Sequence, residues 1–134
     1  MNYFLIKSEP SVYSYDQLVK EKKTAWTGVR NYAARNNLRL MKKGDLCLYY
    51  HSNEGLCIVG IAKVVKEAYQ DPTTEDKNWV CVDVAPFKKL KKPIELSTLK
   101  KDELLKNMQF VKIGRLSVSV VTQEEFDKVC LLGS

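Results

Sequence analysis

Short apolar stretches recur along the chain, and they are rich in the β-branched and aromatic residues that favour strands. They predict strands over about residues 2–7, 45–51, 57–66, 79–87 and 117–121. The polar segment "SNEG" at 52–55 separates two of these stretches and predicts a hairpin turn. We therefore expect a sheet in which at least one pair of strands is antiparallel.

Capping residues predict where the helices begin. Ser, Thr or Asn before an apolar periodic segment commonly accepts a hydrogen bond from the first turn, and Gln or Glu three residues later strengthens the signal. The predicted helices span about 15–22 after Ser14, 31–41 from Asn31, 98–107 after Ser97 and 123–131 after Thr122. The third of them is either one helix or two short pieces. In the second of them Asn31, Arg35 and Arg39 are four residues apart and share one face.

The predicted order of elements is β–α–α–β–β–β–α–β–α. Hairpin-linked strands with helices between the outer strands predict an α+β fold, built on a curved, mostly antiparallel sheet or small β-barrel. A doubly wound parallel fold would need regular βαβ alternation, which is absent. The 134 residues fit a single domain, residues 1–134, because domains commonly have about 100–200 residues.

Composition argues against several classes of protein. The four cysteines each lie in an apolar stretch and form no C-x-x-C or Cys/His cluster, so we expect reduced core residues and no metal site. No apolar run approaches the ~20 residues of a membrane span, and the N-terminus lacks the pattern of a signal peptide. We therefore expect no membrane partner and no secretion, with a location in the cytoplasm of a bacterium or the nucleus of a eukaryote.

The positive charge is concentrated in one segment. The chain carries a formal net charge of +6, and residues 86–101, "PFKKLKKPIELSTLKK", contain six Lys against one Glu. Such a segment can bind the phosphates of a nucleic acid or can simply be a solvated surface. On the first interpretation its candidate phosphate ligands are Lys88, Lys89, Lys91 and Lys92.

Catalytic motifs are missing from the sequence. His51 is the only histidine, and no G-x-S-x-G turn supplies a nucleophile for it. No phosphate loop and no G-x-G-x-x-G are present, so no nucleotide cofactor is expected. We expect a protein that is not an enzyme and has no cofactor, in which His51 packs, forms a hydrogen bond or contacts a ligand.

The segment "AWTGVRNYAARNN" at 25–37 indicates recognition chemistry. Trp26 offers a flat face on which a base can stack, although a lone Trp is often a core residue. Gly28 permits close backbone approach, while Arg30, Asn31 and Arg35 suit base edges or phosphates. Further candidates are the aromatic residues Tyr49, Tyr50, Tyr69 and Trp79, for several of which the alternative is a place in the core. Arg115 is either a phosphate ligand or an ordinary surface residue.

Several motifs together resemble the EVE domain family. They are "YFLIKSEP" at 3–10, "WTGVRNYAARNNLRLMKKGD" at 26–45, "YYHSN" at 49–53, "YQDPT" at 69–73, "WVCVDV" at 79–84 and "IGRLSV" at 113–118. The resemblance implies a PUA-like fold, a small β-barrel with helices packed at its openings. It also implies a relationship to YTH domains and binding of modified bases in DNA or RNA. The sequence departs from the family pattern at Thr27 and Ala33.

The resemblance also implies roles for individual residues. Trp26 matches the first tryptophan of an aromatic cage and Tyr69 falls near the second aromatic. Other positions match residues that line the pocket in the family or are added here as candidate ligand contacts. They are Lys7, Ser8, Glu9, Thr27, Val29, Asn31, Tyr32, Tyr50, His51, Trp79, Arg115, Leu116 and Ser117.

The leading hypothesis is a monomeric, non-enzymatic reader of a modified nucleobase in DNA or RNA. Trp26 would stack on the base, and Ser8, Asn31 and Ser117 would bind its edge. Phosphates would bind to Arg30, Arg35, Arg115 and the lysines of 88–92. Two alternatives stay open at this point: a sensor of a small nucleoside-like molecule that uses the same pocket, and an enzyme that modifies a nucleotide or RNA.

Overall fold

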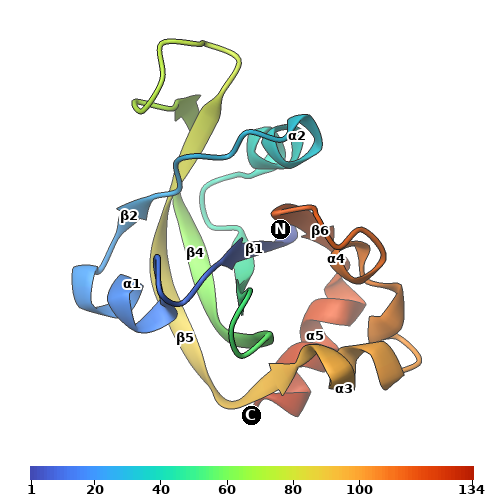
Figure 1. The fold of residues 1–134 in the computed structure, drawn as a ribbon. Coiled ribbons are helices and arrows are strands. Elements are labelled where there is room, and N and C mark those ends of the chain that lie inside the picture. Colours follow the sequence, from blue (N-terminus) through green and yellow to red (C-terminus); the bar gives the residue numbers. More distant parts are fainter.

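A computed structural model describes residues 1–134 and shows one six-stranded sheet flanked by helices (Figure 1). The strands lie in the order β2-β5-β4-β3-β1-β6. They are β1 (Tyr3–Ser8), β2 (Thr24–Ala25), β3 (Leu46–His51), β4 (Cys57–Gln70), β5 (Val80–Glu95) and β6 (Val118–Val121). The helices are α1 (Tyr15–Glu21), α2 (Tyr32–Leu40), α3 (Leu96–Lys101), the 3₁₀ turn η1 (Leu105–Asn107), α4 (Gln109–Lys112) and α5 (Gln123–Leu132).

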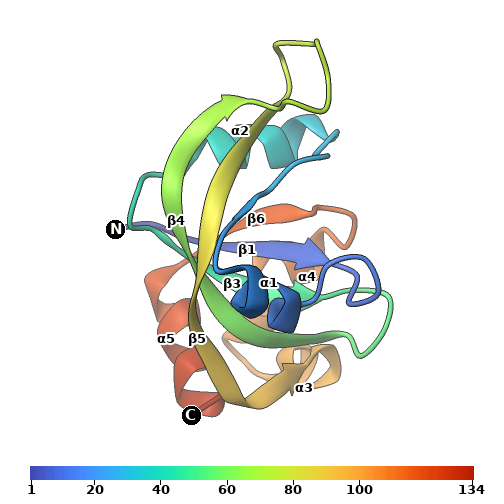
Figure 2. The same ribbon diagram turned by 90° about the vertical axis from the view of Figure 1, so that its left-hand side faces the viewer.

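The predicted α+β class is confirmed, but the closed barrel is not. Neighbouring strands are antiparallel except β1 and β3, which pair in parallel from Tyr3–Leu46 to Ser8–His51. The edge strands β2 and β6 do not pair with each other, so the sheet is open. Figure 2 shows the long strands β4 and β5 curving past the shorter ones, with α2 near one end and α3 and α5 near the other.

Both faces of the central strands are buried, which explains their continuous apolar sequence. Successive side chains of a strand point to opposite faces. Phe4 and Ile6 of β1 therefore join a core beneath α1 and α2, whereas Leu5 joins a second core beneath α3, α4 and α5. The sequence predicted β1, β3 and β6 to within a residue or two, and β2, which is only two residues long, was missed.

Three of the four predicted helix starts are confirmed. The side chains of Ser14, Asn31 and Thr122 each accept a hydrogen bond from the first turn of their helix. The prediction for Ser97 was wrong, because α3 already begins at Leu96 and has no side-chain cap. The predicted alternative of two short pieces over 98–107 is confirmed, because α3 ends at Lys101 and η1 follows at Leu105–Asn107; α4 comes after them.

The basic segment is a continuation of a strand. β5 extends to Glu95, well beyond the predicted end at residue 87, because Leu90 and Ile94 are buried against the second core. The lysines between them are exposed, and Lys89 forms an ion pair with Asp16 at 2.8 Å. None of the helices combines the length and the apolar character that crossing a membrane requires.

Candidate nucleic-acid interface

A cavity of about 570 Å³ opens where the end of β1 meets the segment that follows β2. β1 supplies its last two residues, and the pairing of β2 with β5 directs residues 26–31 along the opposite side. The cavity is lined by Lys7, Ser8, Val12, Tyr13, Thr24, Ala25, Trp26, Thr27, Gly28, Val29, Arg30, Asn31 and Ser117. Nine of these residues are ones that the sequence predicts for recognition, and the fold brings them together: Lys7, Ser8, Trp26, Thr27, Gly28, Val29, Arg30, Asn31 and Ser117.

Trp26 is both a core residue and a wall of the cavity. Its side chain is only 8% exposed, and its backbone N–H donates to the carbonyl of Val82 at 2.7 Å. The ring meets Tyr49 edge-to-face with centroids 5.4 Å apart. Trp26 therefore does not stand free on a loop, and only a small part of its surface is available to a ligand.

Tyr13 is the second aromatic residue of the cavity, and the sequence analysis missed it. Its ring lies edge-to-face with Trp26, with centroids 6.3 Å apart. Its hydroxyl donates to Glu21 at 2.7 Å, and its carbonyl accepts from Tyr49 at 2.7 Å. Tyr13 stands in a turn before α1, where no periodicity or motif separates a pocket residue from an ordinary one.

Tyr69, the predicted second cage aromatic, is not among the residues that line the cavity. Its hydroxyl donates to Asp83, and the ammonium of Lys66 lies 4.2 Å from the centre of its ring. The hydrogen bond to Asp83 and burial raise the pKa of this hydroxyl. Tyr69 therefore belongs to a polar cluster between β4 and β5.

Several polar groups in the cavity have no protein partner. Thr27 and Ser117 line the cavity, and their hydroxyls form no hydrogen bond within the protein. Asn31 caps α2 through Oδ1, which accepts from Ala34 at 3.0 Å, so its amide NH2 remains available. The hydroxyl of Ser8 donates to the carbonyl of Glu9 over a long distance of 3.4 Å. These groups can donate to or accept from the polar edge of a ligand.

The ammonium of Lys7 contacts residues of a neighbouring cavity and not these polar groups. Its ammonium donates to the carbonyl of Gly114 at 2.7 Å and lies 5.5 Å from the ring centre of Phe110. It forms no ion pair with a carboxylate. Burial lowers the pKa of Lys7. Lys7 also lines a second cavity of about 280 Å³ that contains Tyr50, so Tyr50 lies beyond Lys7 and outside the first cavity.

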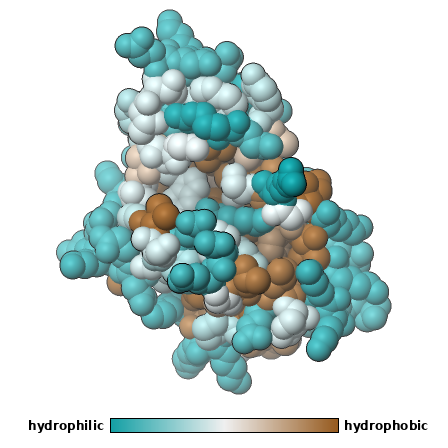
Figure 3. Space-filling model, viewed as in Figure 1, coloured by the Kyte–Doolittle hydropathy of each residue, from teal (hydrophilic) through white to brown (hydrophobic).

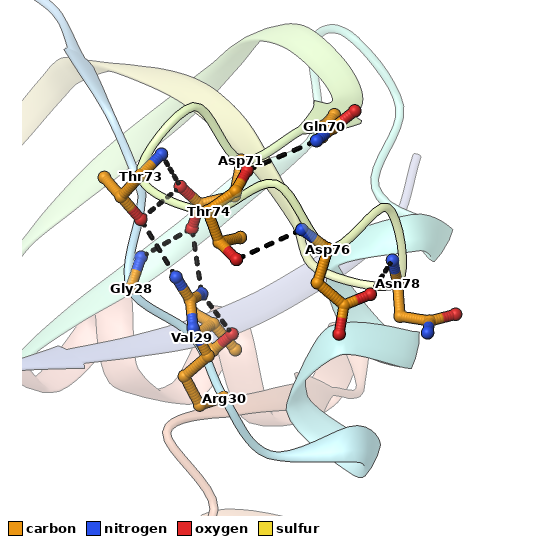
Figure 4. Close-up of polar contacts among 9 residues, drawn as sticks. All are labelled: Gly28, Val29, Arg30, Gln70, Asp71, Thr73, Thr74, Asp76 and Asn78. Atoms are coloured by element: carbon orange, nitrogen blue, oxygen red, sulfur yellow. Dashed lines mark hydrogen bonds and ion pairs between the residues drawn. The ribbon is translucent and has the colours of Figure 1, made fainter.

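Asp71 holds the outer wall of the cavity, and sequence reasoning missed its role (Figure 4). Its fully buried carboxylate accepts from the backbone N–H of Gly28 at 2.8 Å and from Arg30 at 3.0 Å. It also accepts from the backbone and hydroxyl of Thr73, at 2.8 and 2.6 Å. Burial alone would raise the pKa of Asp71, but these hydrogen bonds outweigh it and lower the pKa to about 2. The Asp-Pro-Thr sequence is a turn signal that could have pointed to this role.

Some of the predicted phosphate ligands bind carboxylates of the protein, and others form no ion pair. Arg30 donates to Asp71, to the Thr73 hydroxyl and to the carbonyl of Val29, so it braces the wall. Arg35 and Arg115 form no ion pair. Arg115 lines a third cavity, of about 310 Å³, which shares Asn31 with the first. Lys88, Lys89, Lys91 and Lys92 line none of the cavities described here.

The other predicted residues lie apart from the first cavity. His51 accepts a hydrogen bond from the backbone N–H of Tyr15 through Nε2 at 3.1 Å, and burial lowers its pKa. Glu9 is exposed and its carbonyl closes a turn, while Leu116 is buried in the core. Tyr32 and Trp79 pack against each other on the surface beyond Asn31.

The chain belongs to the EVE domain family, whose model matches residues 2–132. Human thymocyte nuclear protein 1 is 38% identical to it, over 98% of this chain and 73% of the human protein. A crystal structure of a protein from Agrobacterium tumefaciens is 44% identical, with a TM-score of 0.97 over 100% of this chain and 94% of that chain. The human THYN1 protein in complex with DNA containing 5-methylcytosine is 37% identical, with a TM-score of 0.90 over 100% of this chain and 98% of that chain.

Proposed function

We propose that this protein is a non-enzymatic reader of a modified nucleobase in DNA or RNA, bound in the cavity beside Trp26. The composition of that cavity supports the proposal most directly. Trp26 and Tyr13 provide aromatic surface, and Thr27, Asn31 and Ser117 provide unpartnered polar groups. A nucleobase has the same division into a flat face and a polar edge.

The size of the cavity and the nature of a relative support the same ligand class. About 570 Å³ lies within the range of roughly 300–1,000 Å³ that is usual for small-ligand sites. The human THYN1 protein, of the same fold, forms a complex with DNA containing 5-methylcytosine. We infer that a base which is flipped out of a duplex or already single-stranded enters the cavity here.

Specific roles follow for the residues of the cavity. The apolar surface of Trp26 and Val29 would contact the face of the base and an added methyl or hydroxymethyl group. The hydroxyls of Thr27 and Ser117 and the amide of Asn31 would bind its edge. Arg35 and Arg115, which have no carboxylate partner, would contact phosphates. We assign no chemical step to the cavity, and its binding requires no cofactor.

The proposal is tested by fluorescence anisotropy with single-stranded oligonucleotides. The set contains 5-methylcytosine, 5-hydroxymethylcytosine, N6-methyladenine and the unmodified parents at one position. We expect one modified base to bind more tightly than its parent, and Ser117→Ala to reduce this difference. Ser97→Ala, on the exposed surface of α3, is the matched control. Equal binding of every modified base and its parent would contradict the proposal.

A small-molecule sensor is the second candidate, because the volume of the cavity also fits a free nucleoside. The dependence on salt separates the two. A nucleic-acid reader that binds phosphates weakens steeply as salt increases, whereas a neutral nucleoside binds almost independently of salt. The unpaired cations Arg35 and Arg115 favour the nucleic acid.

A further inference from the structure

Tyr32 is an exposed aromatic residue whose position the core does not explain. It is the first residue of α2, and 64% of its side chain is exposed. Its ring packs on Trp79 of the β4–β5 loop, with centroids 5.1 Å apart and planes tilted by 32°. Trp79 is half-buried. Together the two rings form an aromatic surface, the Tyr32–Trp79 platform, which is open to solvent on the Tyr32 side.

The platform lies next to the cavity proposed for the modified base. Tyr32 directly follows Asn31, which lines that cavity. Trp79 lies 5.7 Å from the guanidinium of Arg30, which the buried carboxylate of Asp71 holds in place. Arg30 therefore contacts both the wall of the cavity, through Asp71, and the platform, through Trp79. In Figure 1 the β4–β5 loop projects beside α2, which carries Tyr32.

A cation without a counterion borders the platform. The guanidinium of Arg35 lies 4.9 Å from the ring centre of Tyr32 and 5.8 Å from that of Trp79. Its donors reach only the Asn36 side chain and, at 3.4 Å, the carbonyl of Asn78. Arg39 reaches the same carbonyl and also lacks a carboxylate. Figure 3 shows mainly hydrophilic and neutral side chains over the projecting loop.

We propose that the Tyr32–Trp79 platform stacks a second nucleobase, the immediate neighbour of the base in the cavity, and that Arg35 binds the phosphate between them. An exposed aromatic face beside an unpaired guanidinium matches the alternation of base and phosphate along one strand. This inference rests on the proposed function and extends it from one base to two adjacent nucleotides. The occupant is a single strand, or a strand opened locally around the flipped base.

The test uses single-stranded trinucleotides with the preferred modified base in the centre. The flanking positions are natural nucleotides, or an abasic sugar on one side that keeps the phosphate and removes the base. We expect wild type to lose affinity by about tenfold when the base on one particular side is removed, because one stacked base is lost. Tyr32→Ala should cause the same loss with the natural trinucleotide and no further loss with that abasic ligand.

Two further variants separate stacking from a structural role. Tyr32→Phe keeps the ring and should bind like wild type, whereas Tyr32→Leu keeps an apolar contact with Trp79 and should behave like Tyr32→Ala. Leu40→Ala, at the exposed far end of α2, is the matched control. Arg35→Gln should lower the slope of log K against log salt by about 0.7, as expected for one phosphate contact on a single strand.

Each outcome bears on a stated claim. If Tyr32→Ala weakens natural and abasic ligands equally, the platform supports the fold and the inference is wrong. If Tyr32→Ala affects only duplex ligands, Tyr32 acts as a wedge and the inference is again wrong. If wild type binds modified and parent bases equally but shows the abasic effect, the reader function fails and the platform stands.

Discussion

The backbone N–H of Gly28 donates to the buried carboxylate of Asp71 at 2.8 Å, joining segments 43 residues apart (Figure 4). Gly28 lies two residues after Trp26, and Asp71 begins the loop between β4 and β5. The position of the cavity wall is therefore fixed by a polar contact with a loop that does not itself line the cavity.

Asp71→Asn should destabilise the protein at neutral pH. In the wild type, the pKa of Asp71 is about 2, against an ordinary value of 3.8. This difference corresponds to about 2 kcal/mol by which the ionised carboxylate stabilises the folded state. Because the folded-state pKa is the lower one, this contribution is complete above pH 4 and is lost as the pH falls toward 2. Urea unfolding of wild type and Asp71→Asn between pH 3 and pH 7 measures the difference in their free energies of unfolding. This difference should become smaller toward pH 3. A difference in free energy of unfolding that does not change with pH would contradict the role given to Asp71.

Gly28→Ala should reduce stability by about 1–2 kcal/mol because of its backbone conformation. Gly28 has φ of +82°, and an added Cβ would meet no atom within 4 Å, so the cost is conformational and not steric. Gly28→Asn should cost less, since Asn adopts this region more readily. Gly114→Ala, at another open site without positive φ, should be neutral. Thermal unfolding of the three variants provides the comparison, and equal effects of Ala and Asn at position 28 would count against this explanation.

Trp26→Ala should reduce stability as well as binding. The side chain is nearly buried, and removing a large aromatic residue from a core commonly costs about 3–5 kcal/mol. This variant is therefore a poor test of ligand contact. Ser117→Ala removes a hydroxyl that has no partner in the protein, so it should weaken binding and leave the midpoint of denaturation nearly unchanged. A large loss of stability in Ser117→Ala would show that its hydroxyl has a structural partner.

Arg30→Gln should change the stability of the protein, whereas Arg115→Gln should change the salt dependence of binding. The sequence predicts both residues as phosphate ligands. Arg30 donates to the buried Asp71, so its loss should cost about 1.5–3 kcal/mol of stability and leave the salt dependence of binding unchanged. Arg115 is exposed and forms no ion pair, so its loss should barely affect stability. It should instead lower the salt slope by about 0.7 for a single strand. Denaturant and salt titrations of each variant separate the two roles.

Local signals in the sequence predicted much of the fold. The capping roles of Ser14, Asn31 and Thr122 depend on residues three positions away, so a single segment contains the whole signal. The parallel pairing of β1 with β3 was not predicted, because it joins strands separated by α1, β2 and α2. The extension of β5 was hidden by lysines that alternate with only two buried residues, Leu90 and Ile94.

The candidate site was predicted where one segment supplied several members. Residues 26–31 and the end of β1 lie together as expected. Tyr13 and Asp71 were missed because their positions depend on distant partners: Trp26 for Tyr13, and Gly28 for Asp71. Tyr69 illustrates the converse, because its aromatic character suggested a cage while its hydroxyl is engaged by Asp83.

The central place of β1 between β3 and β6 makes one side of the cavity depend on a pairing of distant parts of the chain. Lys7 at the end of β1 donates its backbone N–H to the carbonyl of Ser117 at 3.0 Å, across 110 positions of the chain. Loop-closure entropy opposes a contact between residues so far apart in the sequence, so this side of the cavity forms only when most of the chain between them has been brought together. Folding of the cavity therefore accompanies folding of the whole sheet, and a partly folded chain in which β1 and β6 are still separate lacks this side of the cavity.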